Sequence, residues 1–308
     1  MTAQAHQRLT LIVCTRDRLA QLRATLDCIL RLRCREPWQL VVVDNGSSDG
    51  TLPWLQSLQS TPAVRVEVTS EPIQGVSRAR NQGLTLAVGE IVAFTDDDCY
   101  PVGSFLDDLL VAFAPGDLDY CGGRLILHDP GDRPVSLRTS TTPAAYAPGS
   151  FVPAGAICGA NMAFRRKTLE VIGPFDVALG AGAATCAGED TDLVFRASWA
   201  GFRGAYLPHL LVRHHHGRRS AAAARATDTG YDVGRGAFYA KHLMRRATRL
   251  FMLRKWWWHL YLRSRAGRRR FLNELRGAWI YLRCARTMPV AGQSTASAAN
   301  RARQPALP

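Results

Sequence analysis

The feature that most constrains the fold is an alternation of short apolar runs with helical patterns in the opening part of the chain. Four runs of strand length are apolar or rich in β-branched residues: 9–14, 39–43, 64–69 and 91–95. Between them, leucine and isoleucine recur at helical spacing, as in 19–30 and 52–58. Strands that alternate with helices favour a mostly parallel sheet with helices on both faces. We therefore expect an α/β fold.

Polar residues follow three of these strands directly. Residues 15–18 follow the first strand, Asp44 follows the second, and the acidic triplet 96–98 follows the fourth. In doubly wound sheets, ligands bind outside the carboxyl ends of the strands. The sequence therefore predicts one ligand site made from these three segments.

The triplet Asp96–Asp97–Asp98 points to a cation. Adjacent carboxylates repel one another and are costly to bury unless a cation or strong donors converge on them. Mg²⁺ or Mn²⁺ prefers carboxylate oxygens and shares its other positions with waters and substrate phosphates, which indicates a nucleotide with a pyrophosphate. By side-chain chemistry alone, a solvated acidic turn is an equal alternative.

The eight cysteines include no CxxC pair, and no secretory segment precedes the first strand. This pattern favours reduced thiols in a cytoplasmic protein. No apolar run approaches the roughly 20 residues that span a bilayer.

The net charge of +14 is unevenly distributed. Residues 218–308 contain 20 of the 39 lysines and arginines but only 3 of the 25 acids, whereas residues 1–217 carry a net charge of −3. A near-neutral body with a strongly basic tail suggests an anionic partner for the tail.

Spaced motifs extend this pattern through residues 8–216. They read CTRDR at 14–18, VVVDNGSSDGT at 41–51, GVSRARNQGL at 75–84, FTDDDCYP at 94–101, GANMAFRRKTLEVIGPFD at 159–176 and GEDTDLVFRASWAGFR at 188–203. In this order they resemble the inverting glycosyltransferases of family 2, which have the nucleotide-diphospho-sugar transferase fold called GT-A. The resemblance implies metal-dependent transfer of a sugar from a nucleotide-diphosphate donor to a hydroxyl of a glycan or lipid-linked acceptor, in cell-surface or exopolysaccharide synthesis.

The resemblance also implies roles for acidic residues. Asp190 matches the family's catalytic base, with Glu189 as the alternative, although acids in a first helical turn also serve as caps. Asp98 is the implied metal ligand and Asp96 the implied ribose partner. Asp97 suits either role.

Other positions border the same nucleotide pocket by resemblance. Asp44 matches the carboxylate that accepts from the nucleotide base. The remaining substrate-binding candidates are Thr15, Arg16, Asn45, Arg78 and Asn81. Two structural alternatives stay open: Arg80 pairs with an acid of the sheet, and Asn81 caps its helix.

Three histidines end a strand expected over residues 210–216. Alternation places His214 and His216 on one face of that strand. The family often has a metal-contacting histidine here, so the resemblance implies that one of these two completes the cation's shell. Solvated histidines are the alternative.

The middle of the chain is less regular. Residues 129–153 are dense in Pro, Gly, Ser and Thr and are interpreted as a mobile acceptor-side loop or a mere connector. Residues 159–164 are expected to lead into a helix over 165–172 that ends at Gly173, and a further helix is expected over 189–199.

The basic tail shows two helical stripes. Trp257 and Trp279 recur with leucines at helical spacing among many arginines, which suits an anionic membrane surface. We expect a catalytic domain over 1–217, a basic amphipathic helical extension over 218–290, and a disordered tail over 291–308, with the protein peripheral at the inner face of the plasma membrane. The alternative is that the stripes pack on the body or on a second subunit in a homo-oligomer.

Two other function classes are compatible with parts of the chain. A nucleic-acid-binding protein would use the basic tail, but a −3 body with an acidic triplet repels phosphate unless a metal intervenes, so no nucleic acid is expected. A catalytically silent sugar-nucleotide binder is the second alternative, against which the intact acids argue.

Overall fold

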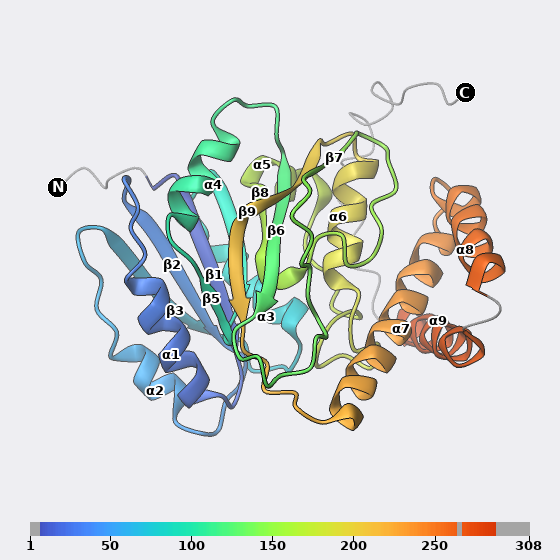
Figure 1. Ribbon diagram of the computed structural model, residues 1–308, viewed down its shortest axis with the longest axis horizontal. Coiled ribbons are helices and arrows are strands. Elements are labelled where there is room, and N and C mark those ends of the chain that lie inside the picture. The colour runs from blue at the N-terminus through green and yellow to red at the C-terminus, as the bar shows by residue number, and fades with distance from the viewer. Residues whose placement is uncertain (1–6, 264–266, 288–308) are drawn as a thin grey trace.

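The structure is a computed structural model that describes residues 7–263 and 267–287. Within these residues a nine-stranded sheet forms the centre of the molecule, with helices on both faces and a group of three helices at one end (Figure 1). This is the α/β architecture that the alternating pattern predicts, and the basic tail is helical as expected.

The predicted strands make the parallel half of the sheet. They are β1 (Leu9–Thr15), β2 (Trp38–Asp44), β3 (Val64–Ser70) and β4 (Ile91–Asp96). All pair in parallel, with β1 between β2 and β4. Because β1, β2 and β4 run the same way, Thr15, Asp44 and Asp96 arrive at one edge of the sheet.

The other half of the sheet is mixed. Its strands are β8 (Met162–Arg165), β6 (Tyr120–Leu127), β9 (Gly204–His214), β5 (Cys99–Pro101) and β7 (Ala144–Tyr146). The order is β3-β2-β1-β4-β8-β6-β9-β5, and β7 pairs with β9. The short strand β5 turns back from the end of β4 and pairs antiparallel with β9, which places Cys99 opposite His214.

Helices cover the sheet in two layers. One face carries α1 (Leu19–Leu30), α2 (Thr51–Gln56) and α4 (Phe105–Phe113), which pack on Leu11 and Val42. The other carries α3 (Val76–Leu86), α5 (Arg166–Ile172) and α6 (Glu189–Trp199), which pack on Ile12 and Phe94. Residues on both faces are apolar because the strands are buried on both sides.

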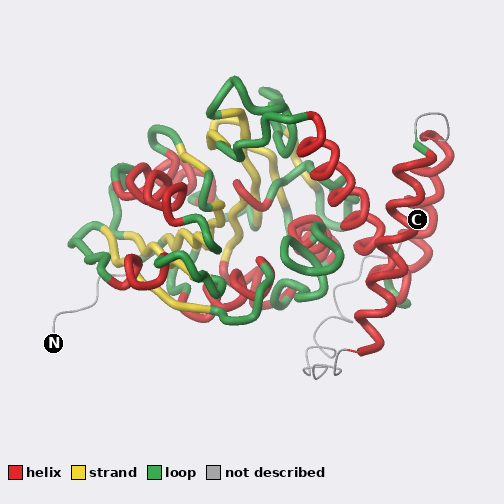
Figure 2. Tube along the Cα trace, turned by 90° about the horizontal axis from the view of Figure 1, so that it is seen from below, coloured by secondary structure: helices red, strands yellow, loops and turns green. Residues whose placement is uncertain are grey.

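Three helices follow the body: α7 (Ala221–Met244), α8 (Arg249–Arg263) and α9 (Arg268–Thr287). Figure 2 shows them together at one end of the molecule, with α7 nearest the body. Helices α7 and α9 cross closely, because a Cβ on Gly236 would lie 1.9 Å from the Glu274 carbonyl oxygen. None of the described helices is long and apolar enough to cross a membrane.

The basic extension contacts the body through α7. Phe238 and Tyr239 of α7 pack with Phe195 of α6, and Met252 of α8 joins the same cluster. The extension therefore packs on the body through residues outside the two predicted stripes. The described residues of the stripes stay exposed: Leu250, Leu253, Trp257, Leu272, Leu275, Trp279 and Leu282. The alternative in which the stripes pack on the body is not borne out for these residues. The expected disordered tail over 291–308 lies outside the described residues.

The structure corrects several sequence-based expectations. Residues 159–164, expected to lead into a helix over 165–172, contain most of β8, which pairs with β4 and β6, and the helix begins one residue later, at Arg166. The strand expected to run to residue 216 ends at His214. The loop 129–153 contains β7, which the sequence pattern did not predict.

Candidate active site

Buried donors converge on the acidic triplet. Asp97 and Asp98 are each 4% exposed, so the alternative of a solvated turn is wrong. The Thr15 hydroxyl donates to Asp97 Oδ2 at 2.7 Å. The Arg18 guanidinium donates to Asp97 Oδ1 at 2.7 Å and to Asp98 Oδ2 at 2.8 Å. These contacts compensate for burying two adjacent carboxylates.

The two buried carboxyls differ in proton affinity. Burial raises the pKa of Asp97 to about 7, against the opposing charge of Arg18. Burial also acts on Asp98, but the hydrogen bond and charge of His214, together with Arg18, outweigh it and hold the pKa of Asp98 below its usual range. Asp98 is therefore an ionised carboxylate at neutral pH, which a metal ligand must be.

Asp98, Cys99 and His214 bring three potential ligand atoms within 4.8 Å of one another. His214 Nε2 lies 3.3 Å from Asp98 Oδ1. Burial raises the pKa of the Cys99 thiol well above its usual value, so the thiol stays protonated and is a poor ligand. The donors that remain are one carboxylate, which suits Mg²⁺ and Mn²⁺, and one imidazole.

His214 and His216 lie on one side of the chain, as alternation predicts, with ring centroids 5.0 Å apart. Only His214 belongs to the potential metal group within the described residues. His216 contacts the Arg133 carbonyl through Nε2 at 3.1 Å, and its Nδ1 accepts from the Arg218 amide and lies 3.5 Å from Asp132. The ring of His216 thus holds the loop after β6.

Helix α6 presents the Glu-Asp pair at its first turn. The helix follows Gly188, whose φ of 99° lies in the left-handed region that favours glycine. Asp190 is half-buried, and its Oδ2 accepts from the Gly159 amide at 2.9 Å. Its Oδ1 accepts from the Thr191 amide at 2.6 Å. The carboxylate is therefore oriented by backbone donors beside the sheet edge.

Arg80 joins the two acidic groups. Its Nη1 lies 2.9 Å from Glu189 Oε1, and its Nη2 lies 3.1 Å from Asp96 Oδ1. The alternative in which Arg80 pairs with an acid of the sheet is thus confirmed. The side chain is 4% exposed, so this buried bridge fixes α6 against the end of β4.

Glu189 differs chemically from its neighbour. Burial, and next the charge of Asp190, raise the pKa of Glu189 to about 7, against the opposing charge of Arg80. Asp190 is the more accessible of the two and carries no ion pair among the described residues, whereas Glu189 is occupied by Arg80. The arrangement leaves Asp190 available to accept a proton.

Two predicted nucleotide residues lie at the end of β2. Asp44 is buried, its Oδ2 accepts from the Ser47 amide at 3.1 Å, and its Oδ1 has no hydrogen-bond partner. An unpaired buried carboxylate oxygen is costly, so it is suited to accept from a ligand. Asn45 is fully used by the backbone: it donates to the Glu71 and Ile73 carbonyls and accepts from the Gly75 amide.

The other predicted substrate residues differ in how far contacts within the protein occupy their side chains. Arg16 is partly exposed and lies beside Asp17 and the Asn45 carbonyl. Arg78 on α3 has no ion pair among the residues that the structure describes. Asn81 lies inside α3 and holds the backbone of Phe175 through both side-chain atoms, so the expectation that it caps the helix is wrong.

Sequence reasoning gave no role to Arg18, although the residue lies in the CTRDR motif. The signal that could have found Arg18 is a positively charged side chain just after the carboxyl end of β1. Parallel pairing of β1 with β4 brings that position next to the acids that follow β4. Gly159 was also missed. A Cβ there would lie 2.8 Å from Arg80 Nη2, so glycine keeps room for the bridge.

The fold and the acidic site at its carboxyl edge define a GT-A type architecture, the class in which nucleotide-diphospho-sugar transferases are found. The sequence profile described as "Glycosyl transferase family 2" matches residues 10–173. The chain belongs to this family.

Curated relatives share part of the chain. The pre-mycofactocin glycosyltransferase of Mycobacterium tuberculosis is 29% identical over 224 residues, which cover 69% of this chain and 43% of the relative. The glycosyltransferase AglE of Haloferax volcanii is 26% identical over 181 residues, covering 58% of this chain and 57% of the relative. The chain thus spans about half the length of these relatives.

Solved structures show the same fold. The mannosyltransferase PcManGT of Pyrobaculum calidifontis, in complex with GDP-Man and Mn²⁺, has a TM-score of 0.57 at 20% identity, with 98% of this chain and 80% of that chain covered. TarS of S. aureus in complex with UDP has a TM-score of 0.60 at 17% identity, with 80% of this chain and 68% of that chain covered.

Proposed function

We propose that the protein is a metal-dependent, inverting glycosyltransferase. It moves a sugar from a nucleotide-diphosphate donor to a hydroxyl of a glycan or lipid-linked acceptor, in cell-surface or exopolysaccharide synthesis. The observation that carries the proposal is the joining of two acidic groups at one sheet edge by Arg80, with Asp96 on one side and Glu189 beside Asp190 on the other.

In this proposal the residues around the triplet hold the donor. Asp44 accepts from the nucleotide base through its unpaired Oδ1, and Asp96 accepts from the ribose. Asp98 and His214 would hold Mg²⁺ or Mn²⁺, which would stabilise negative charge on the diphosphate. Arg18 contributes a second positive charge next to the same carboxylates.

Asp190 acts on the acceptor side as the general base. The Gly159 amide holds its Oδ2, and the carboxylate takes the proton of the acceptor hydroxyl as that oxygen attacks the anomeric carbon of the sugar. The bond from that carbon to the diphosphate oxygen breaks, and the nucleotide diphosphate leaves from the opposite face. The neighbouring Glu189 is tied to Arg80 and orients the turn. Inversion needs only this one base, because the attack occurs once and from one face.

The C-terminal helices are proposed to dock on an anionic membrane, which would place the protein at the inner face of the plasma membrane. Large apolar side chains are exposed on α8 and α9: Leu250, Leu253, Trp257, Leu272, Leu275 and Trp279. Exposed arginines share these helices, among them Arg254, Arg268 and Arg276. Apolar and basic groups together match the acyl and phosphate layers of an anionic bilayer.

Donor binding is the first test. A panel of UDP, GDP and dTDP sugars is assayed for Mn²⁺-dependent binding by calorimetry and for slow donor hydrolysis. We expect one nucleotide class to bind, Asp98→Ala to abolish metal-dependent binding, and Asp190→Ala to keep binding but lose at least about a hundredfold in turnover. Arg166→Ala, on the exposed side of α5, is the matched surface control.

Each alternative function has its own outcome in this experiment. Binding of a donor without hydrolysis or transfer to any acceptor would favour a silent sugar-nucleotide binder. Absence of donor binding, together with steeply salt-dependent binding of nucleic acid, would favour a nucleic-acid-binding protein. Either result would contradict the proposed transferase.

A further inference from the structure

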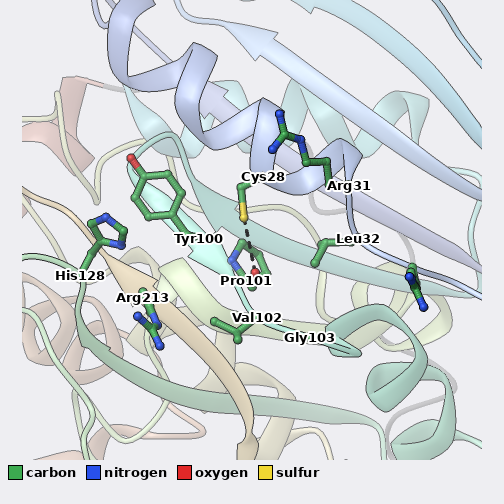
Figure 3. Close-up of a pocket in the computed structure, with 10 residues that line it drawn as sticks. Cys28, Arg31, Leu32, Tyr100, Pro101, Val102, Gly103, His128 and Arg213 are labelled. Carbon is green, nitrogen blue, oxygen red and sulfur yellow. Dashed lines mark hydrogen bonds between the residues drawn. The ribbon is translucent and has the colours of Figure 1, made fainter.

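A second pocket lies on the opposite face of the strand that follows the acidic triplet. Its volume is about 610 Å³, and it is formed by the end of α1 and the three residues that follow it, by β5 and the two residues after it, and by residues at the ends of β6 and β9 (Figure 3). None of the residues assigned above to donor, metal or base lines it. A cavity of this size holds a ligand the size of a mono- or disaccharide.

The pairing of β5 with β9 explains why the pocket is separate from the metal site. Cys99 pairs with His214, and Tyr100 pairs with Arg213. Successive side chains of a strand point to opposite faces. The Cys99–His214 pair therefore faces the acidic site, whereas Tyr100 and Arg213 line the second pocket.

The pocket is positively charged. Arg31, Arg33 and Arg213 line it, and none of its lining residues carries a carboxylate. Arg33 and Arg213 form no ion pair within the described ranges, and Arg31 meets only the exposed Asp27 at 2.8 Å. In Figure 3, Arg31 and Arg213 lie on opposite sides of the pocket, with Cys28 and Pro101 between them. Guanidinium groups bind carboxylate and phosphate with two parallel hydrogen bonds.

The floor and one wall are aromatic and apolar. Tyr100 and His128 lie with ring centroids 4.6 Å apart, and Val102 and Leu32 complete the apolar surface. The pKa of His128 is lowered by burial and further by the positive charges of His215 and Arg213, so its ring is neutral at pH 7. A neutral ring surface beside the guanidinium groups of Arg33 and Arg213, which form no ion pair among the described residues, suits a ligand with both a ring and an anionic group.

We propose that this pocket binds an acidic saccharide, one that carries a carboxylate or a phosphate. The anionic group binds the arginines, and the less polar face of the sugar ring packs on Tyr100 and Val102. The site lies on the opposite face of β5 and β9 from the metal-binding residues, so a bound saccharide contacts the molecule outside the donor site. This inference does not rest on the proposed transferase activity.

Binding is measured on the full chain in EDTA, without donor, by calorimetry and saturation-transfer NMR with glucuronate, glucose 6-phosphate and glucose. We expect both acidic sugars to bind with ring protons in contact, and glucose not to bind. The double variant Arg31→Gln/Arg213→Gln should weaken binding about tenfold or more. The control Arg35→Gln/Arg166→Gln removes the same charge from exposed positions outside the pocket and should change affinity less than about twofold.

Three outcomes would overturn the proposal. Equal affinity of wild type and Arg31→Gln/Arg213→Gln for glucuronate would show that the pocket arginines do not bind it. Inorganic phosphate that binds as tightly as glucose 6-phosphate would show an anion site without saccharide recognition. Glucose that binds as well as glucuronate would remove the requirement for charge. Because no donor or metal is present, each result leaves the proposed function untouched.

Discussion

At the scale of single residues, His214 and His216 have similar surroundings in sequence and different ones in space. His214 Nε2 lies 3.3 Å from Asp98, whereas His216 contacts Arg133 and Asp132. We expect His214→Gln to weaken Mn²⁺ binding about tenfold or more, because one imidazole ligand is lost. The measurement is a Mn²⁺ titration followed by electron paramagnetic resonance.

His216→Gln is the matched control, since it removes the same ring from the same side of the chain. It should change Mn²⁺ affinity by less than about threefold. If His216→Gln weakened Mn²⁺ binding as much as His214→Gln does, the assignment of His214 as the ligand would be wrong.

Glu189 gives a prediction about pH. Its pKa is raised from 4.5 to about 7 in the folded protein, so the folded state holds this proton more tightly than the unfolded state. The contribution to stability is fully present below pH 4.5 and is lost as pH rises toward 7. We expect the free energy of unfolding of wild type, relative to Glu189→Gln, to fall by about 1–3 kcal/mol across this window.

The measurement is urea unfolding of both proteins in EDTA at intervals from pH 4 to pH 8. The comparison with Glu189→Gln matters because Asp97, whose pKa is also raised to about 7, titrates in the same window and is common to both proteins. A difference between wild type and variant that rises with pH would contradict the prediction, since it would mean that Glu189 ionises more readily when folded.

At the scale of elements, a buried ionic network ties α7 to the helix that carries Asp190. Lys241 Nζ lies 2.8 Å from both Asp192 and Asp176, and His242 Nε2 lies 2.9 Å from Asp192. Arg196 Nε contacts the second oxygen of Asp192 at 2.8 Å. Asp192 follows the candidate base by two residues, so α7 helps to fix the position of α6.

Lys241→Met should lower the free energy of unfolding by about 2–4 kcal/mol, because it leaves Asp176 and Asp192 buried with fewer positive partners. The measurement is equilibrium urea unfolding. Lys167→Met makes the same substitution at an exposed lysine and should change stability by less than about 0.5 kcal/mol. Equal losses in the two variants would show that the network does not stabilise the fold.

At the scale of the whole molecule, the exposed face of α8 and α9 predicts membrane binding that depends on lipid charge. We expect binding to vesicles that contain phosphatidylserine, weakening as salt increases, and little binding to neutral vesicles. Leu253→Ser/Trp257→Ser should weaken binding about tenfold or more, because each buried apolar side chain contributes about 1.5–3 kcal/mol. The assay is vesicle co-sedimentation.

Ile73→Ser/Val111→Ser is the control, because both residues are exposed apolar side chains on the body. It should leave sedimentation with anionic vesicles unchanged. If the two double variants bound equally, the docking surface would not be α8 and α9.

Much of the fold was accessible from the sequence. The strands β1 to β4 and the helices α1, α3 and α6 are local patterns, and parallel pairing then requires their polar ends to meet. The structure confirms the α/β fold and brings residues after β1 into contact with the triplet: Thr15 with Asp97, and Arg18 with Asp97 and Asp98. The residue types needed for a cation and a nucleotide were likewise readable as motifs.

Tertiary structure alone decided which of these side chains remain free. Asn45 and Asn81 match the motifs, yet the side chains of both form hydrogen bonds with backbone groups of the protein. Arg18, which lies in the CTRDR motif, forms an ion pair with the acidic triplet. β8 and β5 are too short to show a periodic pattern, because their stability comes from pairing with distant strands. Local sequence pattern therefore determined the strands and the polar residues at their carboxyl ends. Long-range packing decided the strand order, the Arg80 bridge and the pocket lined by Tyr100 and Arg213. Such contacts join residues far apart in the chain, and no short sequence window contains both partners.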